Sequence, residues 1–531
     1  MKRENIRECS AFAWSMRRAC QVCFPTLLVL SWLALSALHE KRFVAHMASE
    51  SSKPELPDFW LRPQADEAPR CRPLTGELWP DVHAITTHPN DSSVNVQTTR
   101  SCEDVKISKT LGIAVLSCDP GRHKWNAVMG TLEEHEPRGA LWVMDYRTGG
   151  ADAQPTVLAI DAFPDGYDFH PLGLGIHEVS ANRARIFAVN HGELVNTIEV
   201  IDVFREAPAS RWHAQYVRTV AHPYGTHTAN SVQVLGANEI LVTNTHASMR
   251  RPPPRRDTHK VLSGLYGGFA AWLLTTPLSN KNIIPRAQEV ENLVGSGWIA
   301  HVSFADEVPV PARDRPDEFA RGVHARVLAK HIPYTNGIGL APNGRSVVVA
   351  STTATGVYIY PVRAFTATDA PDWRAPRVLG DPVLVPTPFF ADNLGVEPPK
   401  RGAAVHPADP LGGASIFLAG NPSLVDLHEM LHAEGDAAGA PSWAVEIKYT
   451  GRTTPDAAPF RAESRMPTVP RGWSVRTIFQ TNGLGYLDGG RRISMPSSTG
   501  VAWDQSCEGH GSLFITGLYA PVPLLCSGMY S

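Results

Sequence analysis

Oxygen-bearing side chains follow many of the apolar runs in this sequence. Asparagine or aspartate ends several of these runs, at Asn190, Asn244, Asn336, Asp392-Asn393 and Asn421. An acidic pair, Glu103-Asp104, stands just before the first strong apolar run. Amide and carboxylate oxygens gathered at one point form the hard-oxygen site that Ca²⁺ prefers over the nitrogen and sulfur ligands of zinc. The same residue types are common in ordinary turns, so the pattern alone leaves both interpretations open.

A second motif suggests different chemistry. His428-Glu429-Met430-Leu431-His432 is H-E-x-x-H, which in zinc peptidases places two imidazoles and a glutamate base on one face of a helix. The extended form of that motif needs a further histidine where this chain has Ala438. Two histidines leave zinc one protein ligand short, so a zinc peptidase is the weaker hypothesis.

Other catalytic classes are excluded by what the sequence lacks. It contains no G-x-S-x-G elbow, no Walker A loop and no dinucleotide-binding fingerprint. Lysine and arginine number 49 against 52 aspartates and glutamates, a net charge of -3. This balance argues against a nucleic-acid partner.

The elements that must position these residues are predicted to be strands. Short runs rich in Val, Ile, Tyr and Phe recur between Gly, Asn and Pro, for example at 139–146, 185–190, 197–204, 239–244, 346–351, 356–362, 415–421, 443–449 and 512–518. Their length and boundaries are typical of strands and not of helices. The sequence therefore predicts an all-β protein, with a propeller, a sandwich and several barrels as candidates, because no exact repeat is visible.

The N-terminal segment predicts a membrane anchor. Residues 19–38 carry no charge, and basic residues precede them in greater number than follow them. A stretch of this length can span a bilayer with its basic flank in the cytosol, and a cleaved signal peptide is the alternative. We expect a cytosolic tail and anchor over 1–44, a linker over 45–69 and a folded domain over 70–531. That domain would be lumenal or extracellular, on a single-pass membrane protein or a secreted one.

The cysteines agree with an oxidising compartment. Five of the eight lie after the anchor segment, at Cys71, Cys102, Cys118, Cys507 and Cys526, so at least one is unpaired within the chain. Cys71 with Cys526 can close the domain as one large loop, and Cys102 with Cys118 can form a second bridge. Asn90-Asp91-Ser92 is an acceptor sequon for N-glycosylation.

A set of short motifs occurs in the order known from one family. They are Ser101-Cys102-Glu103-Asp104, Phe169-His170-Pro171-Leu172-Gly173, Val189-Asn190-His191, Ala229-Asn230-Ser231, Thr335-Asn336-Gly337-Ile338, Ala391-Asp392-Asn393-Leu394, Ala419-Gly420-Asn421-Pro422 and the closing segment from Ser497 to Cys526. Together they span about residues 70–531, and in this respect the chain resembles the paraoxonase/arylesterase family. The resemblance implies a six-bladed β-propeller with two calcium ions in its central tunnel. It implies hydrolysis of aryl esters or lactones by water, with calcium polarising the carbonyl.

The resemblance also implies site residues. The catalytic calcium would be bound by Glu103, Asn230, Asn336, Asp392 and Asn393. A structural calcium would be bound by Asp104 and the backbone carbonyl of Leu174, but its third usual ligand, an aspartate, corresponds to Ser231. Asn421 and Leu172 are expected near the substrate.

The position of the general base is where the chain departs most from the family. One of the family's two catalytic histidines matches His191, whereas the other corresponds to Leu172. His170 and His177 lie nearby in sequence. Glu103 or Asp392 can serve as base instead, and His191 can alternatively hold a neighbouring blade. A propeller that has lost catalysis and acts as a binding or scaffold protein is therefore the alternative function.

One apolar segment has no clear place in the strand pattern. Residues 262–278 fall where the family has an amphipathic helix at the tunnel mouth. The resemblance implies that this helix lines substrate entry and touches lipid, and an ordinary buried helix is the other interpretation.

Overall fold

The structure is a computed structural model of the 531-residue chain. It describes residues 56–62, 70–76, 98–128, 130, 132, 138–149, 152–164, 168–193, 195–205, 211–250, 288, 291–292, 294–305, 319–368, 370–432, 439–452, 468–488, 491–505 and 511–529. The predicted tail and anchor (1–44), the sequon at Asn90 and the apolar segment 262–278 lie outside the described residues, as does most of the linker 45–69. Among the described helices, none combines the length and the apolar character needed to cross a bilayer.

Most of the described chain forms six antiparallel sheets of four or five strands, numbered here as blades in chain order. Blade 1 is β3 (Cys102–Ser108), β4 (Ile113–Cys118), β5 (Ala140–Asp145) and β6 (Thr156–Val157). Blade 2 is β8 (Pro171–Ser180), β9 (Arg183–His191), β10 (Asn196–Arg205) and β11 (Trp212–Val220), with β7 (Ile160–Asp161) parallel to β11. Blade 3 is β12 (Ala229–Gly236), β13 (Glu239–Asn244), β14 (Gly297–Phe304) and β15 (Val323–Ile332).

Blade 4 is β16 (Thr335–Leu340), β17 (Ser346–Ser351), β18 (Gly356–Pro361) and β19 (Val383–Pro386). Blade 5 is β20 (Phe390–Glu397), β21 (Ser415–Asn421), β22 (Ser442–Tyr449) and β23 (Trp473–Thr481), with β1 (Trp60–Leu61) on its outer edge. Blade 6 is β26 (Ser498–Asp504), β27 (Gly511–Gly517) and β28 (Leu524–Met529), with β2 (Arg70–Pro73) outermost. A hairpin of β24 (Tyr486–Asp488) and β25 (Arg491–Ile493) and the helix α5 (Leu424–His432) complete the described elements.

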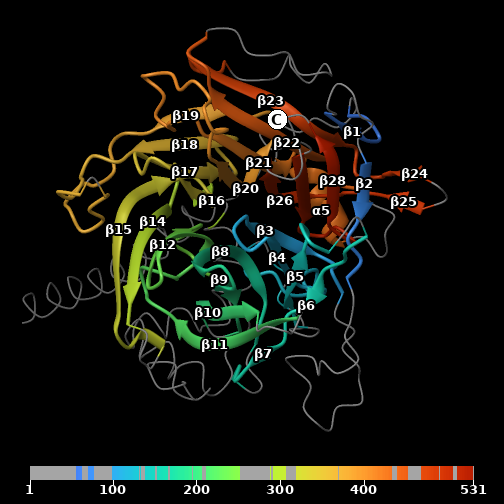
Figure 1. The fold of residues 1–531 in the computed structure, drawn as a ribbon, viewed down its shortest axis with the longest axis horizontal. Helices are drawn as coiled ribbons and strands as arrows, with labels where there is room; N and C mark the ends of the chain where they lie inside the picture. The colour runs from blue at the N-terminus through green and yellow to red at the C-terminus, as the bar shows by residue number, and fades with distance from the viewer. Residues whose placement is uncertain are drawn as a thin grey trace, which may run out of the picture.

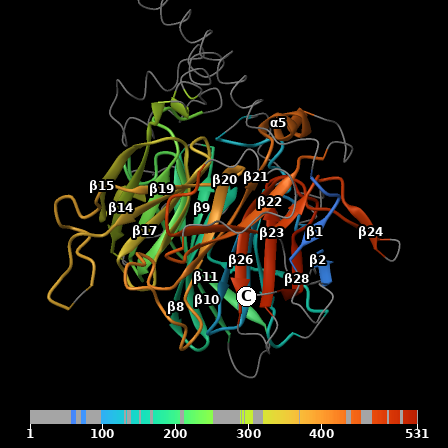
Figure 2. The same cartoon turned by 90° about the horizontal axis from the view of Figure 1, so that it is seen from above.

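The first long strand of each blade lies at the centre of the molecule. These strands contact one another in a closed ring, in the order β3, β8, β12, β16, β20, β26 and back to β3. Figure 1 shows the blades following one another around this centre in chain order, and Figure 2 shows α5 at one end of the strands. The fold is a six-bladed β-propeller. This confirms the predicted fold and excludes the sandwich and the barrels.

The apolar runs are continuous because both faces of the middle strands are buried. In β9, Ile186 and Ala188 pack toward blade 1, whereas Phe187 and Val189 pack toward blade 3. Successive residues of a strand point to opposite faces of its sheet. A middle strand whose sheet is covered on both faces by neighbouring blades therefore needs apolar side chains at every position. Six clusters of buried apolar side chains follow this rule, one between each pair of adjacent blades.

Residues from the two ends of the described chain close the ring. β2 pairs with β28 in the last blade, where Cys71 lies opposite Cys526 and is joined to it by a disulfide across 455 residues of sequence. A second disulfide joins Cys102 of β3 to its direct neighbour on β4, Cys118. Both predicted bridges are confirmed. Figure 1 shows β1 and β2 (blue) beside the red strands of the last two blades.

Removing the ring-closing disulfide is expected to destabilise the propeller. The double variant Cys71→Ser, Cys526→Ser releases the strand β2 from a covalent link that closes almost the whole domain. Disulfides that close long loops contribute roughly 3–5 kcal/mol, and we expect a loss of that size. Urea unfolding of wild type and variant measures it. The variant Cys102→Ser, Cys118→Ser is the comparison, because that bridge closes only a short loop and should cost less.

Candidate metal centre

Each innermost strand is irregular at the same depth in the propeller. The register to the second strand shifts between Cys102 and Asp104, and corresponding shifts occur in β8, β12, β16, β20 and β26. A bulge breaks the alternation of side chains and re-aims those within it. All five predicted ligands of the catalytic calcium lie inside these irregular stretches: Glu103, Asn230, Asn336, Asp392 and Asn393.

The bulges bring these residues together. Glu103, Asn230, Asn336 and Asp392 line one cavity of about 550 Å³ at the end of the tunnel where α5 lies. The fifth, Asn393, is fully buried and donates a hydrogen bond from Nδ2 to Glu103 Oε1 at 2.6 Å. Residues from four different blades, up to 290 positions apart in the chain, thus surround one point.

Four side-chain oxygen atoms at this point accept no hydrogen bond from the described part of the chain. Among the described residues, Glu103 Oε2 and the side-chain oxygens of Asn230, Asn336 and Asn393 are buried and have no hydrogen-bond partner. A buried acceptor without a partner costs about 1–3 kcal/mol, so four together would be unfavourable in a merely structural site. A hard cation satisfies all of them at once, because carboxylate and amide oxygens are the ligands that Ca²⁺ takes. The donor set therefore fits calcium.

The charges at the site support the same interpretation. Burial, together with the negative charges of Asp104 and Asp392, raises the pKa of Glu103 well above its ordinary value. Burial, with a further contribution from Asp104, raises the pKa of Asp392 to about 8, although a hydrogen bond from Asn336 opposes the shift. These carboxylates disfavour each other's ionisation in the absence of a nearby cation, and a divalent ion would reverse the effect.

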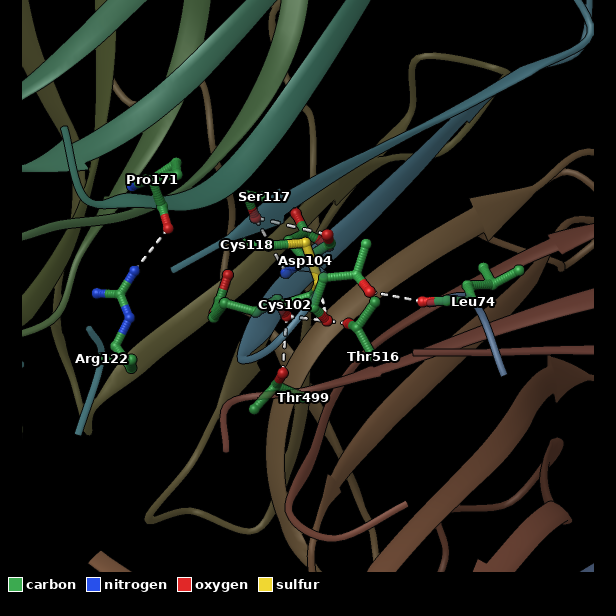
Figure 3. Close-up of a disulfide and its surroundings, with 11 residues drawn as sticks. Leu74, Cys102, Asp104, Ser117, Cys118, Arg122, Pro171, Thr499 and Thr516 are labelled. Carbon is green, nitrogen blue, oxygen red and sulfur yellow. Dashed lines mark hydrogen bonds between the residues drawn. A yellow bond between two sulfur atoms is a disulfide. The ribbon is translucent and has the colours of Figure 1, made fainter. Parts of the chain in front are cut away.

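Neighbouring blades fix Glu103 in position. Its backbone carbonyl accepts hydrogen bonds from Thr499 Oγ1 at 2.7 Å and Thr516 Oγ1 at 3.2 Å, both in blade 6. Figure 3 shows these two threonines beside the Cys102–Cys118 disulfide, which holds the start of β3 against β4. The backbone that carries the carboxylate is thereby held by two blades and a covalent bond.

Glycines allow the inner strands to approach the ligands closely. A Cβ atom on Gly337 would lie 2.7 Å from Asn393 Cα and 2.8 Å from the carbonyl oxygen of Asp392. A Cβ atom on Gly173 would lie 2.3 Å from the carbonyl oxygen of Asn230, and one on Gly500 would lie 2.3 Å from Thr516 Oγ1. A larger residue at Gly337 or Gly173 would displace backbone that carries a candidate ligand, and one at Gly500 would displace a threonine that holds the carbonyl of Glu103.

The predicted second calcium site is different. Asp104 Oδ1 accepts hydrogen bonds from Val105 N and Lys106 Nζ, and Oδ2 accepts one from the backbone N–H of Leu174 at 2.9 Å. Leu174 thus contributes a donor to this carboxylate, and a lysine ammonium lies against it. Ser231 stands where the family has a carboxylate ligand. The residues present do not fit a second divalent ion.

The three histidines considered as general base, His170, His177 and His191, do not line the cavity. His191 is fully buried, and its Nε2 donates to the carbonyl oxygen of Ala229 at 2.7 Å. His170 is also buried, with Nδ1 3.0 Å from Asp119 Oδ2, and His177 is half-buried on β8. None of the three is among the residues that line the 550 Å³ cavity, whereas Leu172 and Asn421, which were expected near the substrate, both line it.

A different histidine, His246, lines the cavity and was missed from the sequence. It follows β13 by two residues, and its Nε2 lies 2.6 Å from Asn292 Oδ1. An amide oxygen only accepts, so Nε2 carries the proton and Nδ1 carries the lone pair. Burial lowers the pKa of His246 to about 4, so the imidazole is neutral at pH 7. Its place after a strand-terminal asparagine, Asn244, is the one sequence signal that could have identified it.

The H-E-x-x-H residues lie on the helix α5. His428 and Glu429 lie on α5 and line the same cavity, together with the apolar residues Leu424, Val425 and Leu427. In the part of the chain that the structure describes, no group of three or more His, Cys, Asp or Glu side chains is close enough to hold a metal ion. Asparagine amides are thus essential members of the candidate site.

Comparisons with known proteins add little at the level of sequence. No family model matches the chain, and no curated protein matches it. Solved structures that are similar include a luciferin-regenerating enzyme, with 8% identity over 82% of this chain and 92% of that one and a TM-score of 0.36. A calcium-binding regucalcin from Agrobacterium tumefaciens has 10% identity over 81% and 91% (TM-score 0.32). A putative 6-phosphogluconolactonase from Bacteroides uniformis has 10% over 73% and 76% (TM-score 0.30).

Similarity this low carries no argument about activity, and none of these proteins is described as a paraoxonase. The ring of contacts between the inner strands identifies the fold, and the buried oxygen atoms identify the candidate site. The chain is a six-bladed β-propeller whose central cavity is lined by carboxylate and amide oxygens suited to one hard cation.

Proposed function

We propose that this protein hydrolyses aryl esters or lactones in a calcium-dependent reaction at the central cavity. The observation that supports this most directly is the group of four buried oxygens without donors on Glu103, Asn230, Asn336 and Asn393. A calcium ion held there supplies electrostatic stabilisation of the negative charge that develops on a carbonyl oxygen when water attacks.

The cavity walls support a substrate with an apolar body. Leu172, Phe390, Leu424, Leu427 and Leu518 line the same space as the oxygen cluster. A volume of about 550 Å³ is in the range of small-molecule sites, which are mostly apolar with a few polar groups that set orientation. An aryl or alkyl group packed on this wall would direct the polar ester group toward the carboxylates and amides.

One wall residue offers a donor for the substrate. Asn421 Oδ1 accepts a hydrogen bond from Ser423 N at 2.7 Å, which fixes the amide orientation. Asn421 Nδ2 is buried and has no partner among the described residues. We propose that this N–H group hydrogen-bonds an ester oxygen and so selects substrates with a carbonyl group.

We assign different roles to the two histidines. His246 lines the cavity with a neutral ring and an unprotonated Nδ1, which supports it as acceptor of the proton from water. His191 bonds the carbonyl of Ala229, the residue directly before the candidate ligand Asn230. That contact crosses from blade 2 to blade 3 and supports a positioning role for His191.

Matched substitutions separate these roles. His246→Gln is expected to lower kcat by about 10²-fold or more, the usual contribution of a general base, with the calcium dissociation constant unchanged. His191→Gln is expected to weaken calcium binding and to leave kcat at saturating calcium within a few fold. Steady-state kinetics over a calcium titration measures both effects. The reverse pattern would show that His191 is the base.

The test of the function itself is a hydrolysis assay on the full chain with phenyl acetate and δ-valerolactone. We expect turnover that EGTA abolishes and added Ca²⁺ restores. Asn336→Ala removes a neutral candidate ligand oxygen and should lower kcat/KM by about 10²-fold. Thr352→Val is its control, because it removes the 3.2 Å hydrogen bond from Asn336 Nδ2 and the 2.8 Å hydrogen bond to the carbonyl of Ala391 but no candidate ligand oxygen.

The outcomes of this assay separate the competing functions. Calcium binding without turnover would favour the binding or scaffold propeller over the hydrolase. Activity that needs zinc and not calcium would contradict the proposal and return attention to His428 and Glu429.

A further inference from the structure

A lysine side chain lies inside the tunnel, beyond the candidate calcium ligands. Lys106 is on β3, two residues after Asp104, and its side chain is 18% exposed. It lines a second cavity of about 430 Å³, which is bounded by all six inner strands. The residues of this cavity follow the candidate ligands along each inner strand, so it occupies the half of the tunnel away from α5.

The ammonium group contacts three oxygen atoms. Nζ donates hydrogen bonds to Asp104 Oδ1 and to the backbone carbonyl oxygen of Leu394, both at 3.1 Å. It also lies 3.1 Å from Asp104 Oδ2 as an ion pair. Leu394 belongs to blade 5, and the interaction therefore joins blades 1 and 5 across the tunnel.

Asp104 has no capacity left for another cation. Its two oxygens also accept the N–H groups of Val105 at 2.8 Å and Leu174 at 2.9 Å, the latter from blade 2. Calcium takes six to eight oxygen ligands, usually with several carboxylates. The carboxylate in contact with Lys106 Nζ is that of Asp104, and the ammonium neutralises it.

We infer that the Lys106 ammonium is a built-in cation that takes the place of a second divalent ion in the tunnel and ties blades 1, 2 and 5 together through Asp104. The chain then binds a single calcium ion, at the site of Glu103. This inference concerns the other half of the tunnel and does not depend on ester hydrolysis.

Two other carboxylates at this end also pair with basic side chains. Lys109 pairs with Glu397 of blade 5 and lies 3.9 Å from Asp504 of blade 6, and Arg147 Nη2 lies 2.8 Å from the same aspartate. In the half of the tunnel that holds Glu103, by contrast, the carboxylate of Glu103 accepts its hydrogen bond from the amide of Asn393.

A charge-exchange experiment on the full chain tests the inference. Lys106→Met keeps the length of the side chain but leaves the buried charge of Asp104 unpaired, and we expect Tm in EGTA to fall by roughly 5–10 °C. The double variant Lys106→Met, Asp104→Asn removes both charges and should recover most of that loss. Lys106→Arg, which keeps the charge, should remain close to wild type. No recovery in the double variant, or no effect of Lys106→Met, would overturn the inference.

Metal analysis after dialysis against Ca²⁺ supplies an independent measurement. We expect one calcium per wild-type chain, and two would overturn the inference. A chain that binds no calcium would count against the proposed hydrolase alone, because the Tm comparison in EGTA would still decide the role of Lys106. A double variant Lys106→Ala, Ser231→Asp should gain a second bound calcium, since it restores both space and a carboxylate.

Discussion

Glu103→Gln is expected to lower kcat/KM for δ-valerolactone by about 10³-fold, the largest effect of any single substitution in this protein. Glutamine keeps the shape of the side chain and can still accept the 2.6 Å hydrogen bond from Asn393 Nδ2. It lacks the negative charge that holds a divalent cation among the buried oxygens. Loss of one group that stabilises transition-state charge costs about 10²–10³-fold, and weaker calcium binding adds to that loss.

The control is a carboxylate in the other half of the tunnel. Glu178 accepts hydrogen bonds from Ser108 and Thr110 and lines the 430 Å³ cavity, so Glu178→Gln makes the same chemical change away from the candidate centre. It should leave both turnover and calcium affinity within a few fold of wild type. Equal activity of Glu103→Gln and wild type at saturating calcium would rule out Glu103 as a ligand.

Calcium is expected to stabilise the folded protein strongly at pH 8 and only weakly at pH 5.5. Folding raises the pKa of Asp392 to about 8 and raises that of Glu103 as well. In the calcium-free protein these carboxyls remain protonated at low pH, and their ionisation destabilises the fold as pH rises from about 4 toward 8. Calcium requires the ionised forms, so its affinity falls as pH drops below 8.

The size of this effect can be measured by thermal unfolding. With calcium at about 1,000 times its dissociation constant, the expected stabilisation is about 4 kcal/mol. Calorimetric titration in buffers of different ionisation enthalpy should detect proton release on calcium binding below pH 8. Asp392→Asn should lose the part of the pH dependence that comes from Asp392 and keep the part that comes from Glu103. Equal calcium affinity at pH 5.5 and pH 8 would contradict the assignment of these two carboxyls to the site.

The middle strands of the blades could be predicted from the sequence, and the inner strands could not. The predicted runs 185–190, 239–244 and 415–421 correspond to β9, β13 and β21, each buried on both faces between neighbouring blades. That burial demands an unbroken apolar run, which is visible in the sequence. The inner strand β16 contains Thr335-Asn336-Gly337 and a bulge, so its polar residues conceal the strand pattern.

The candidate ligands show the same division. Residue type alone identified Glu103, Asn336, Asp392 and Asn393 as oxygen donors, and the order of the motifs connected them with Asn230. These side chains meet because bulges occur at equal depth in four blades. No local sequence pattern predicts the position of these bulges. His246 and Lys106 were missed for a related reason, because their roles depend on partners in distant parts of the chain.

The sequence by itself determined the strand-rich composition, the cysteines available for bridges and the kind of ligand available, because these depend on residue type and short-range spacing. Only the tertiary structure decided that six blades close into a ring, that four oxygens lie buried without donors at its centre, and that an ammonium group neutralises Asp104. Each of these depends on contacts between residues far apart in the chain. Such contacts are set by how sheets pack against one another, and local sequence preferences do not specify them.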